Sequence, residues 1–149
     1  MTLAQLEAEP RNEGVIAALR PRATSREGRG PSAWNLDGYE LHTHPDVGER
    51  LEELVAAVPR VRVVPLLGYI CAARDDVVVA VGEGTGRLAL RLATAACPPE
   101  LEPQDHPEFG DDWCAVEIWQ TDLPTERGRE LLVRALERTA AALEPLADA

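Results

Sequence analysis

Two histidines separated by one residue, His42 and His44, have the side-chain type and spacing that point most directly to chemistry. In an extended segment, residues i and i+2 point to the same side, so both imidazoles could reach one divalent metal ion. His106 or Cys114 could complete the set of ligands. Pro45 directly follows His44 and also explains the segment as the approach to a helix. Two interpretations stay open: a metal site, or histidines with local structural roles.

The glycine-rich stretch Gly82-Glu-Gly-Thr-Gly86 could indicate a phosphate-binding loop. Such a loop must lead into the N-terminus of a helix, whose backbone N–H groups meet the anion. Residues 87–92 instead alternate Arg or Ala with Leu, a pattern typical of a strand. Glu83 would also repel a phosphate. We therefore expect a hairpin turn at these glycines.

Paired carboxylates occur at Asp75-Asp76 and at Asp111-Asp112. Acid–base catalysis needs two carboxylates in different environments, so that their pKa values are separated. Both pairs lie in predicted turns, where all four side chains would be solvated. The sequence also contains no nucleophile-elbow signature of a serine hydrolase. These observations favour a protein that is not an enzyme.

The charge of the chain restricts its partners. The 149 residues include 15 basic residues, all of them arginine, and 26 acidic residues, which gives a net charge of −11. Without lysine, a Schiff-base mechanism and a Walker-type phosphate loop are excluded. The negative charge disfavours a broad surface for nucleic acid or anionic membranes.

The sequence favours a cytoplasmic location. The N-terminal residues are polar and acidic, unlike a signal peptide. No apolar run approaches the roughly 18 residues that cross a bilayer. The three cysteines, Cys71, Cys97 and Cys114, are odd in number and form no Cys-x-x-Cys pair. We expect them to be reduced thiols, with Cys71 and Cys114 buried in strands.

The hydrophobic pattern predicts an α+β fold for residues 46–149. A helix is expected over about 46–58, opened by a capping box of Asp46 and Glu49. The β-branched and alternating runs between 61 and 92 predict an antiparallel meander, and 113–120 a further strand. A final helix, capped by Asp122 or Thr125, would end at Pro145. The expected architecture is an antiparallel sheet of about four to five strands with two main helices on one face. The proline-rich acidic stretch 98–112 is expected to lack regular structure.

Residues 1–45 are expected to be an irregular N-terminal extension and linker. Val15, Ile16 and Leu19 form only a small apolar face, and 21–34 lacks apolar periodicity. The arginines of this part are Arg11, Arg20, Arg22, Arg26 and Arg29, and residues 1–34 carry a net charge of +1. Because residues 35–149 carry −12, the arm could fold back on an acidic body. We expect the extension to pack weakly.

The order of elements in 46–146 resembles the YjbR/MmcQ-like family and the related TfoX N-terminal domain. The segments that carry the resemblance are Arg50-Leu-Glu-Glu-Leu-Val-Ala-Ala-Val-Pro59, Gly68-Tyr-Ile-Cys-Ala-Ala73, Val77-Val-Val-Ala-Val81, Arg87-Leu-Ala-Leu-Arg-Leu92, Trp113-Cys-Ala-Val-Glu-Ile118 and Leu131-Leu-Val-Arg-Ala135. The resemblance implies a compact α+β fold and, as inferred for some members, a DNA-related or regulatory role. It implies no catalytic residues.

Three functional hypotheses follow. The first is a non-enzymatic binding or regulatory module for a protein or small-molecule partner. Its contact surface would be the sheet face opposite the helices, with Arg87, Arg91 and Trp119. The second is a metal-binding protein or metal-dependent enzyme that uses His42, His44 and His106. The third is a DNA-associated regulator. We expect no cofactor beyond the metal of the second hypothesis, and the sequence does not indicate an oligomeric state.

Overall fold

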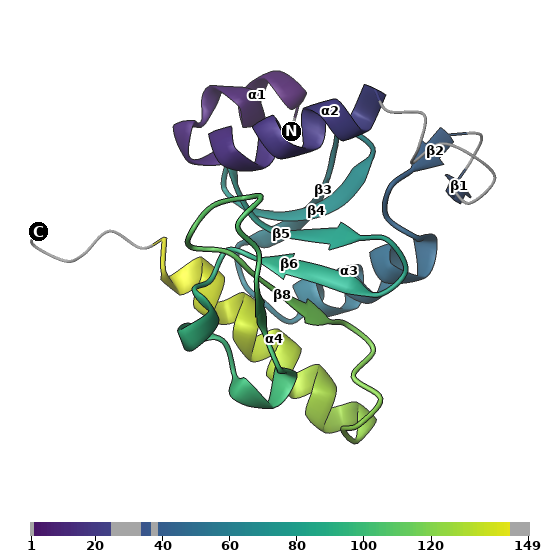
Figure 1. Cartoon of the computed structure of the whole chain (residues 1–149), viewed down its shortest axis with the longest axis vertical. Coiled ribbons are helices and arrows are strands. Elements are labelled where there is room, and N and C mark those ends of the chain that lie inside the picture. Colours follow the sequence, from purple (N-terminus) through teal and green to yellow (C-terminus); the bar gives the residue numbers. More distant parts are fainter. Residues whose placement is uncertain (1, 25–33, 37–38, 144–149) are drawn as a thin grey trace, which may run out of the picture.

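The computed structural model describes residues 2–24, 34–36 and 39–143, and the side chains of 2–23 and 42–143 (Figure 1). Among these residues, six strands form one antiparallel sheet in the order β3-β4-β5-β6-β8-β7. The strands are β3 (Val61–Leu66), β4 (Tyr69–Arg74), β5 (Val77–Glu83), β6 (Arg87–Leu90), β7 (Gln104–Asp105) and β8 (Cys114–Glu117). Two further strands, β1 (Trp34–Leu36) and β2 (Tyr39–Leu41), pair with each other. The predicted α+β class and the antiparallel meander are confirmed, and β7 adds a strand that the sequence did not indicate.

Two helices, α3 (Pro45–Ala56) and α4 (Thr125–Ala141), cover one face of the sheet as expected. Leu51 and Leu54 of α3 and Leu132 of α4 are buried in one core with Leu88 and Leu90 of β6. The predicted capping box is wrong, because α3 begins one residue earlier, at Pro45. His44 is the N-cap, and its Nδ1 accepts a hydrogen bond from the Asp46 amide at 3.0 Å. Pro124 precedes α4 and provides no side-chain cap.

The N-terminal residues cover the opposite face of the sheet. α1 (Leu3–Ala8), the 3-10 turn η1 (Pro10–Asn12) and α2 (Glu13–Thr24) lie along this face (Figure 1). Leu6, Val15 and Leu19 are buried in a second core with Val78 and Val81 of β5. The expectation of weak packing is therefore wrong for these residues. The linker expected over 21–34 is wrong at its start, because α2 continues to Thr24. Residues 25–33, and with them Arg26 and Arg29, lie outside the described residues.

The second layer has a physical cause in β5. Its first six residues, Val77–Gly82, are all buried, so the strand is apolar on both faces. A strand of that kind needs a cover on each face of the sheet. The alternation of Arg or Ala with Leu over residues 87–92 does not leave one face of this segment open to solvent, since Ala89 is buried beneath the N-terminal layer.

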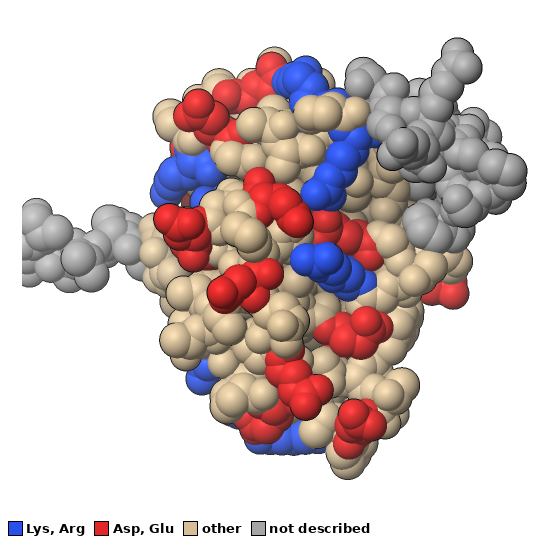
Figure 2. Space-filling view, in the orientation of Figure 1, with Lys and Arg blue, Asp and Glu red and all other residues tan. Residues whose placement is uncertain are grey.

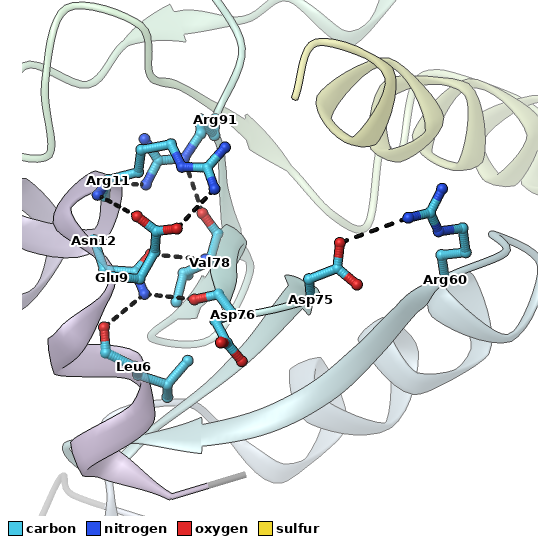
Figure 3. A network of polar contacts seen from close by, with 9 residues as sticks. All are labelled: Leu6, Glu9, Arg11, Asn12, Arg60, Asp75, Asp76, Val78 and Arg91. Carbon is cyan, nitrogen blue, oxygen red and sulfur yellow. Dashed lines mark hydrogen bonds and ion pairs between the residues drawn. The ribbon is translucent and has the colours of Figure 1, made fainter. Parts of the chain in front are cut away.

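Asn12 joins the N-terminal layer to the sheet (Figure 3). Its Nδ2 donates to the carbonyls of Leu6 at 2.9 Å and Asp76 at 2.7 Å, and its Oδ1 accepts from the Val78 amide at 2.8 Å. The side-chain amide thus pairs with the start of β5 as a neighbouring peptide group would. Asn12 has no exposed surface, so these bonds replace water completely.

The acidic stretch 98–112 is more regular than expected. It contains the 3-10 turn η4 (Pro99–Leu101) and β7, and the side chains of Leu101 and Phe109 are buried. Phe109 lies edge-on to Trp113, with ring centroids 5.2 Å apart. These apolar side chains hold the segment on the sheet despite its charge.

Candidate functional site

Glu83, the last residue of β5, is the centre of a charged network between the sheet and α2. Its Oε2 accepts a hydrogen bond from Nη1 of Arg22 at 2.8 Å. Its Oε1 lies 2.6 Å from Nε2 of His106 and 3.6 Å from Nε of Arg87. An ionised carboxylate can only accept, so Nε2 of His106 donates this bond. The network therefore connects α2, β5, β6 and the segment that follows β7.

The network keeps Glu83 ionised. Burial would raise the pKa of this carboxyl, but the hydrogen bonds from His106 and Arg22 outweigh burial and lower the pKa. Only 11% of the side chain is exposed, so its charge depends on these partners rather than on water. A carboxylate held in this state is suited to binding a cation and not to delivering a proton.

His106 is enclosed within the protein. Its side chain has no exposed surface, and its ring stacks on Phe109 with centroids 4.3 Å apart. Nδ1 lies 2.9 Å from Oε2 of Glu108, but the two atoms do not form a hydrogen bond. A substrate could not reach this imidazole without displacing the 106–113 segment. The contacts of His106 hold that segment against Glu83 and α2.

The other two histidines have separate partners. The ring of His42 stacks on Tyr69 with centroids 4.9 Å apart, and His44 caps α3. Thr43 between them is buried, and its hydroxyl donates to the Gly82 carbonyl at 2.6 Å. In the part of the chain that the structure describes, no group of three or more His, Cys, Asp or Glu side chains is placed to hold a metal ion. The three-histidine metal site stays a prediction.

A groove of about 430 Å³ lies beside β8. Its polar lining comes from five places on the chain: Arg87 of β6, Glu102, Gln104 of β7, Glu117 of β8, and the residues Gln120–Asp122 that follow β8. Leu101, Ala115 and Val116 add apolar surface. No residue of α1 or α2 lines it, and in Figure 1 these helices lie at the other end of the sheet from β8.

Arg87 belongs to both the groove and the charged network. Its side chain is 49% exposed, while its Nε lies 3.6 Å from Glu83. Glu117 is its cross-strand neighbour on β8. Residues paired in this way point to the same face of a sheet. The predicted contact residue Arg87 is therefore placed where a ligand could reach it.

Trp119 is one of two exposed large apolar side chains among the described residues, with 43% of its surface accessible. Its indole Nε1 donates to the Thr85 carbonyl at 2.9 Å, which holds the side chain over the β5–β6 turn. Trp119 follows Glu117 by two residues, next to the groove-lining Gln120. The second predicted contact residue is thus exposed, but it is not among the residues that line the groove.

Arg91 does not belong to an open surface, and this part of the predicted contact surface is corrected. Its Nε donates to the Val78 carbonyl at 2.9 Å and its Nη2 to the Arg11 carbonyl at 2.6 Å (Figure 3). Its guanidinium lies 4.9 Å from the centroid of the Trp113 ring. Arg91 therefore fastens η1 to the sheet. The cause is the N-terminal layer, which covers the face on which this residue was expected to be open.

Sequence reasoning missed Glu83, Arg22 as its partner, and the groove-lining residues of 101–104 and 120–122. In the sequence, Glu83 indicates only a charge that repels phosphate, and Arg22 only a part of a basic arm. The one available signal was that an acidic residue ends a fully apolar strand, where burial demands a cationic partner.

Comparisons with protein-family models, with curated proteins and with solved structures give no match. The resemblance to the YjbR/MmcQ-like family and to the TfoX N-terminal domain stays a prediction. In the described part of the chain, no helix is long and apolar enough to cross a membrane.

Proposed function

We propose that this protein is a non-enzymatic binding module whose ligand occupies the groove beside β8. The observation that carries the proposal is the composition of this groove. About 430 Å³ of space is lined by an arginine, carboxylates, side-chain amides and a few apolar side chains. Ligand sites in proteins typically combine such a volume with a few convergent polar groups.

The charged network supports a binding role over a catalytic one. Its histidine is enclosed and its central carboxylate is held ionised by Arg22 and His106. Arg87, at the edge of the network, is the member that lies open to the groove. Glu83 positions this arginine, and a ligand would contact the guanidinium and the nearby Glu117.

We place the module in the cytoplasm. Cys71, Cys97 and Cys114 are all buried and none forms a disulfide. Reduced thiols of this kind are usual in a reducing compartment.

A fragment screen followed by ¹⁵N-edited NMR tests the proposed function. Small polar fragments should shift the amide signals of Gln104, Glu117 and Thr121, and Arg87→Ala should weaken their binding at least fivefold. Arg62→Ala is the matched control, because Arg62 is exposed on β3, at the opposite edge of the sheet. Fragments that shift no signal of the groove, or that bind Arg87→Ala unchanged, would contradict the proposal.

A further inference from the structure

The pairing of β8 shows which of its backbone groups face the groove. Ile118 donates its amide hydrogen to the Gly86 carbonyl on the β6 side at 2.7 Å. In an antiparallel pair, the residues that bond a given neighbour alternate along the strand. The even-numbered residues of β8 therefore bond β6, and the amides of Ala115 and Glu117 point to the opposite edge.

β7 covers only part of that edge. Gln104 pairs with Ala115 and Asp105 with Cys114, and the pairing stops there. Immediately before β7, Pro103 has no amide hydrogen, and Glu102 has a left-handed backbone with φ 51° and ψ 54°. The chain turns away at these two residues. Within the described residues, Glu117 thus pairs with Arg87 of β6 but with no residue of β7, at the position where Glu117 lines the groove.

The groove attracts positive charge. Glu102, Glu117 and Asp122 line it against one arginine, Arg87, which is itself within 3.6 Å of Glu83. Figure 2 shows that acidic side chains are more frequent than arginines over the lower half of the face in view.

We propose that the groove binds an extended peptide segment, which adds a strand beside Glu117 and places arginine or lysine side chains among Glu102, Glu117 and Asp122. The main-chain bonds to Glu117 would provide affinity, and the acidic lining would select basic sequences. This inference rests on the proposed function, because it names the ligand of the same groove.

The test uses three octapeptides with capped ends. The first alternates threonine and arginine, and the second alternates threonine and glutamate. The third has the composition of the first, in scrambled order and built from D-amino acids. Titration followed by ¹⁵N-edited NMR should show the arginine peptide shifting the signals of residues 115–122. The glutamate and D-peptides should bind at least tenfold more weakly. Equal binding of all three would overturn the inference.

N-methylation distinguishes strand addition from simple charge attraction. Alternate amides of an extended peptide face the same edge, so only one set can reach β8. Methylation of either all the threonine amides or all the arginine amides should abolish binding, and methylation of the other set should leave it within threefold. If both methylated peptides bind like the parent, or neither binds, strand addition is wrong.

Glu117→Pro and Glu117→Gln form a matched pair on the protein side. Proline removes the outward amide hydrogen of residue 117, whereas glutamine keeps it and removes only the charge. Glu117→Pro should lose peptide binding at least tenfold beyond Glu117→Gln, and thermal unfolding checks that both variants fold. If proline unfolds the protein, the methylated peptides decide alone. Fragments that still bind the groove when no peptide binds would overturn this inference and leave the proposed function standing; if neither binds, both are wrong.

Discussion

Replacing Asn12 by alanine should destabilise the protein strongly, because one buried side chain satisfies three backbone groups. The change removes the donor to the carbonyls of Leu6 and Asp76 and the acceptor of the Val78 amide hydrogen, bonds of 2.7–2.9 Å. A buried polar group that loses its partner costs about 1–3 kcal/mol. Three such groups set an upper limit near 9 kcal/mol on the loss of unfolding free energy. Water that enters the vacated space should bond some of these groups and reduce the loss. We expect a loss of roughly 3–5 kcal/mol.

Urea unfolding followed by tryptophan fluorescence measures this loss, since Trp113 is buried in the core that Asn12 helps to close. Asn12→Asp should cost at least as much as Asn12→Ala. It keeps the acceptor for the Val78 amide but turns an oxygen toward the carbonyls of Leu6 and Asp76. Glu13→Gln, an exposed neighbour, should change the free energy of unfolding by less than about 0.5 kcal/mol.

A loss below about 1 kcal/mol for Asn12→Ala would refute the reasoning. It would mean that the N-terminal layer does not depend on this amide. Hydrogen exchange separates two ways of losing the layer. Faster exchange confined to α1, η1 and α2 would indicate local undocking, whereas faster exchange throughout the sheet would indicate that the two cores unfold together.

Three further predictions concern Glu83 of the charged network, the glycines on either side of it and the Cys71 thiol. Because the pKa of Glu83 is lowered in the folded protein, the stability that its carboxylate contributes is fully present above the pKa of the unfolded chain. This contribution is lost as the pH falls through the lower pKa of Glu83 in the folded protein. The difference in unfolding free energy between the wild type and Glu83→Gln should therefore shrink toward acid pH. A constant difference from pH 7 to pH 3 would contradict this. Gly82→Ala should cost about 1–3 kcal/mol in urea unfolding, because a Cβ there would lie 2.8 Å from Cγ2 of Thr43 and 3.1 Å from Cγ1 of Val47, and Gly84→Ala, in open space but at φ +60°, should cost less. Burial raises the pKa of the Cys71 thiol, so this cysteine should react with Ellman's reagent only after unfolding, and rapid labelling of the native protein would be the opposite result.

The sequence was sufficient for the meander and for the helices of one layer, because their signals are local. Val77–Gly82 is a run of β-branched and small residues, and 46–58 has helical apolar spacing, so each predicts its own element. The same run in β5 also indicates a second layer. A strand without alternation has both faces covered, and this would have predicted a partner layer from Val15, Ile16 and Leu19.

The candidate site could not be predicted in the same way, because its contacts connect distant parts of the chain. Arg22 and Glu83 are 61 residues apart, and Asn12 and Val78 are 66 apart. Neither pair has a characteristic spacing. Arg87 and Trp119 were identified because strand alternation places them on one face, whereas Arg91 follows the same alternation and is enclosed by η1. Alternation along a strand predicts on which face of the sheet a side chain lies, but it does not predict which part of the chain covers that face.

The most direct test of the binding function is an NMR titration of the ¹⁵N-labelled protein with the threonine–arginine peptide, for the wild type and for Glu117→Pro. The account predicts saturable shifts confined to residues of the groove in the wild type, and at least tenfold weaker binding for the variant. Shifts spread over the whole acidic surface, with equal affinity for both proteins, would contradict it.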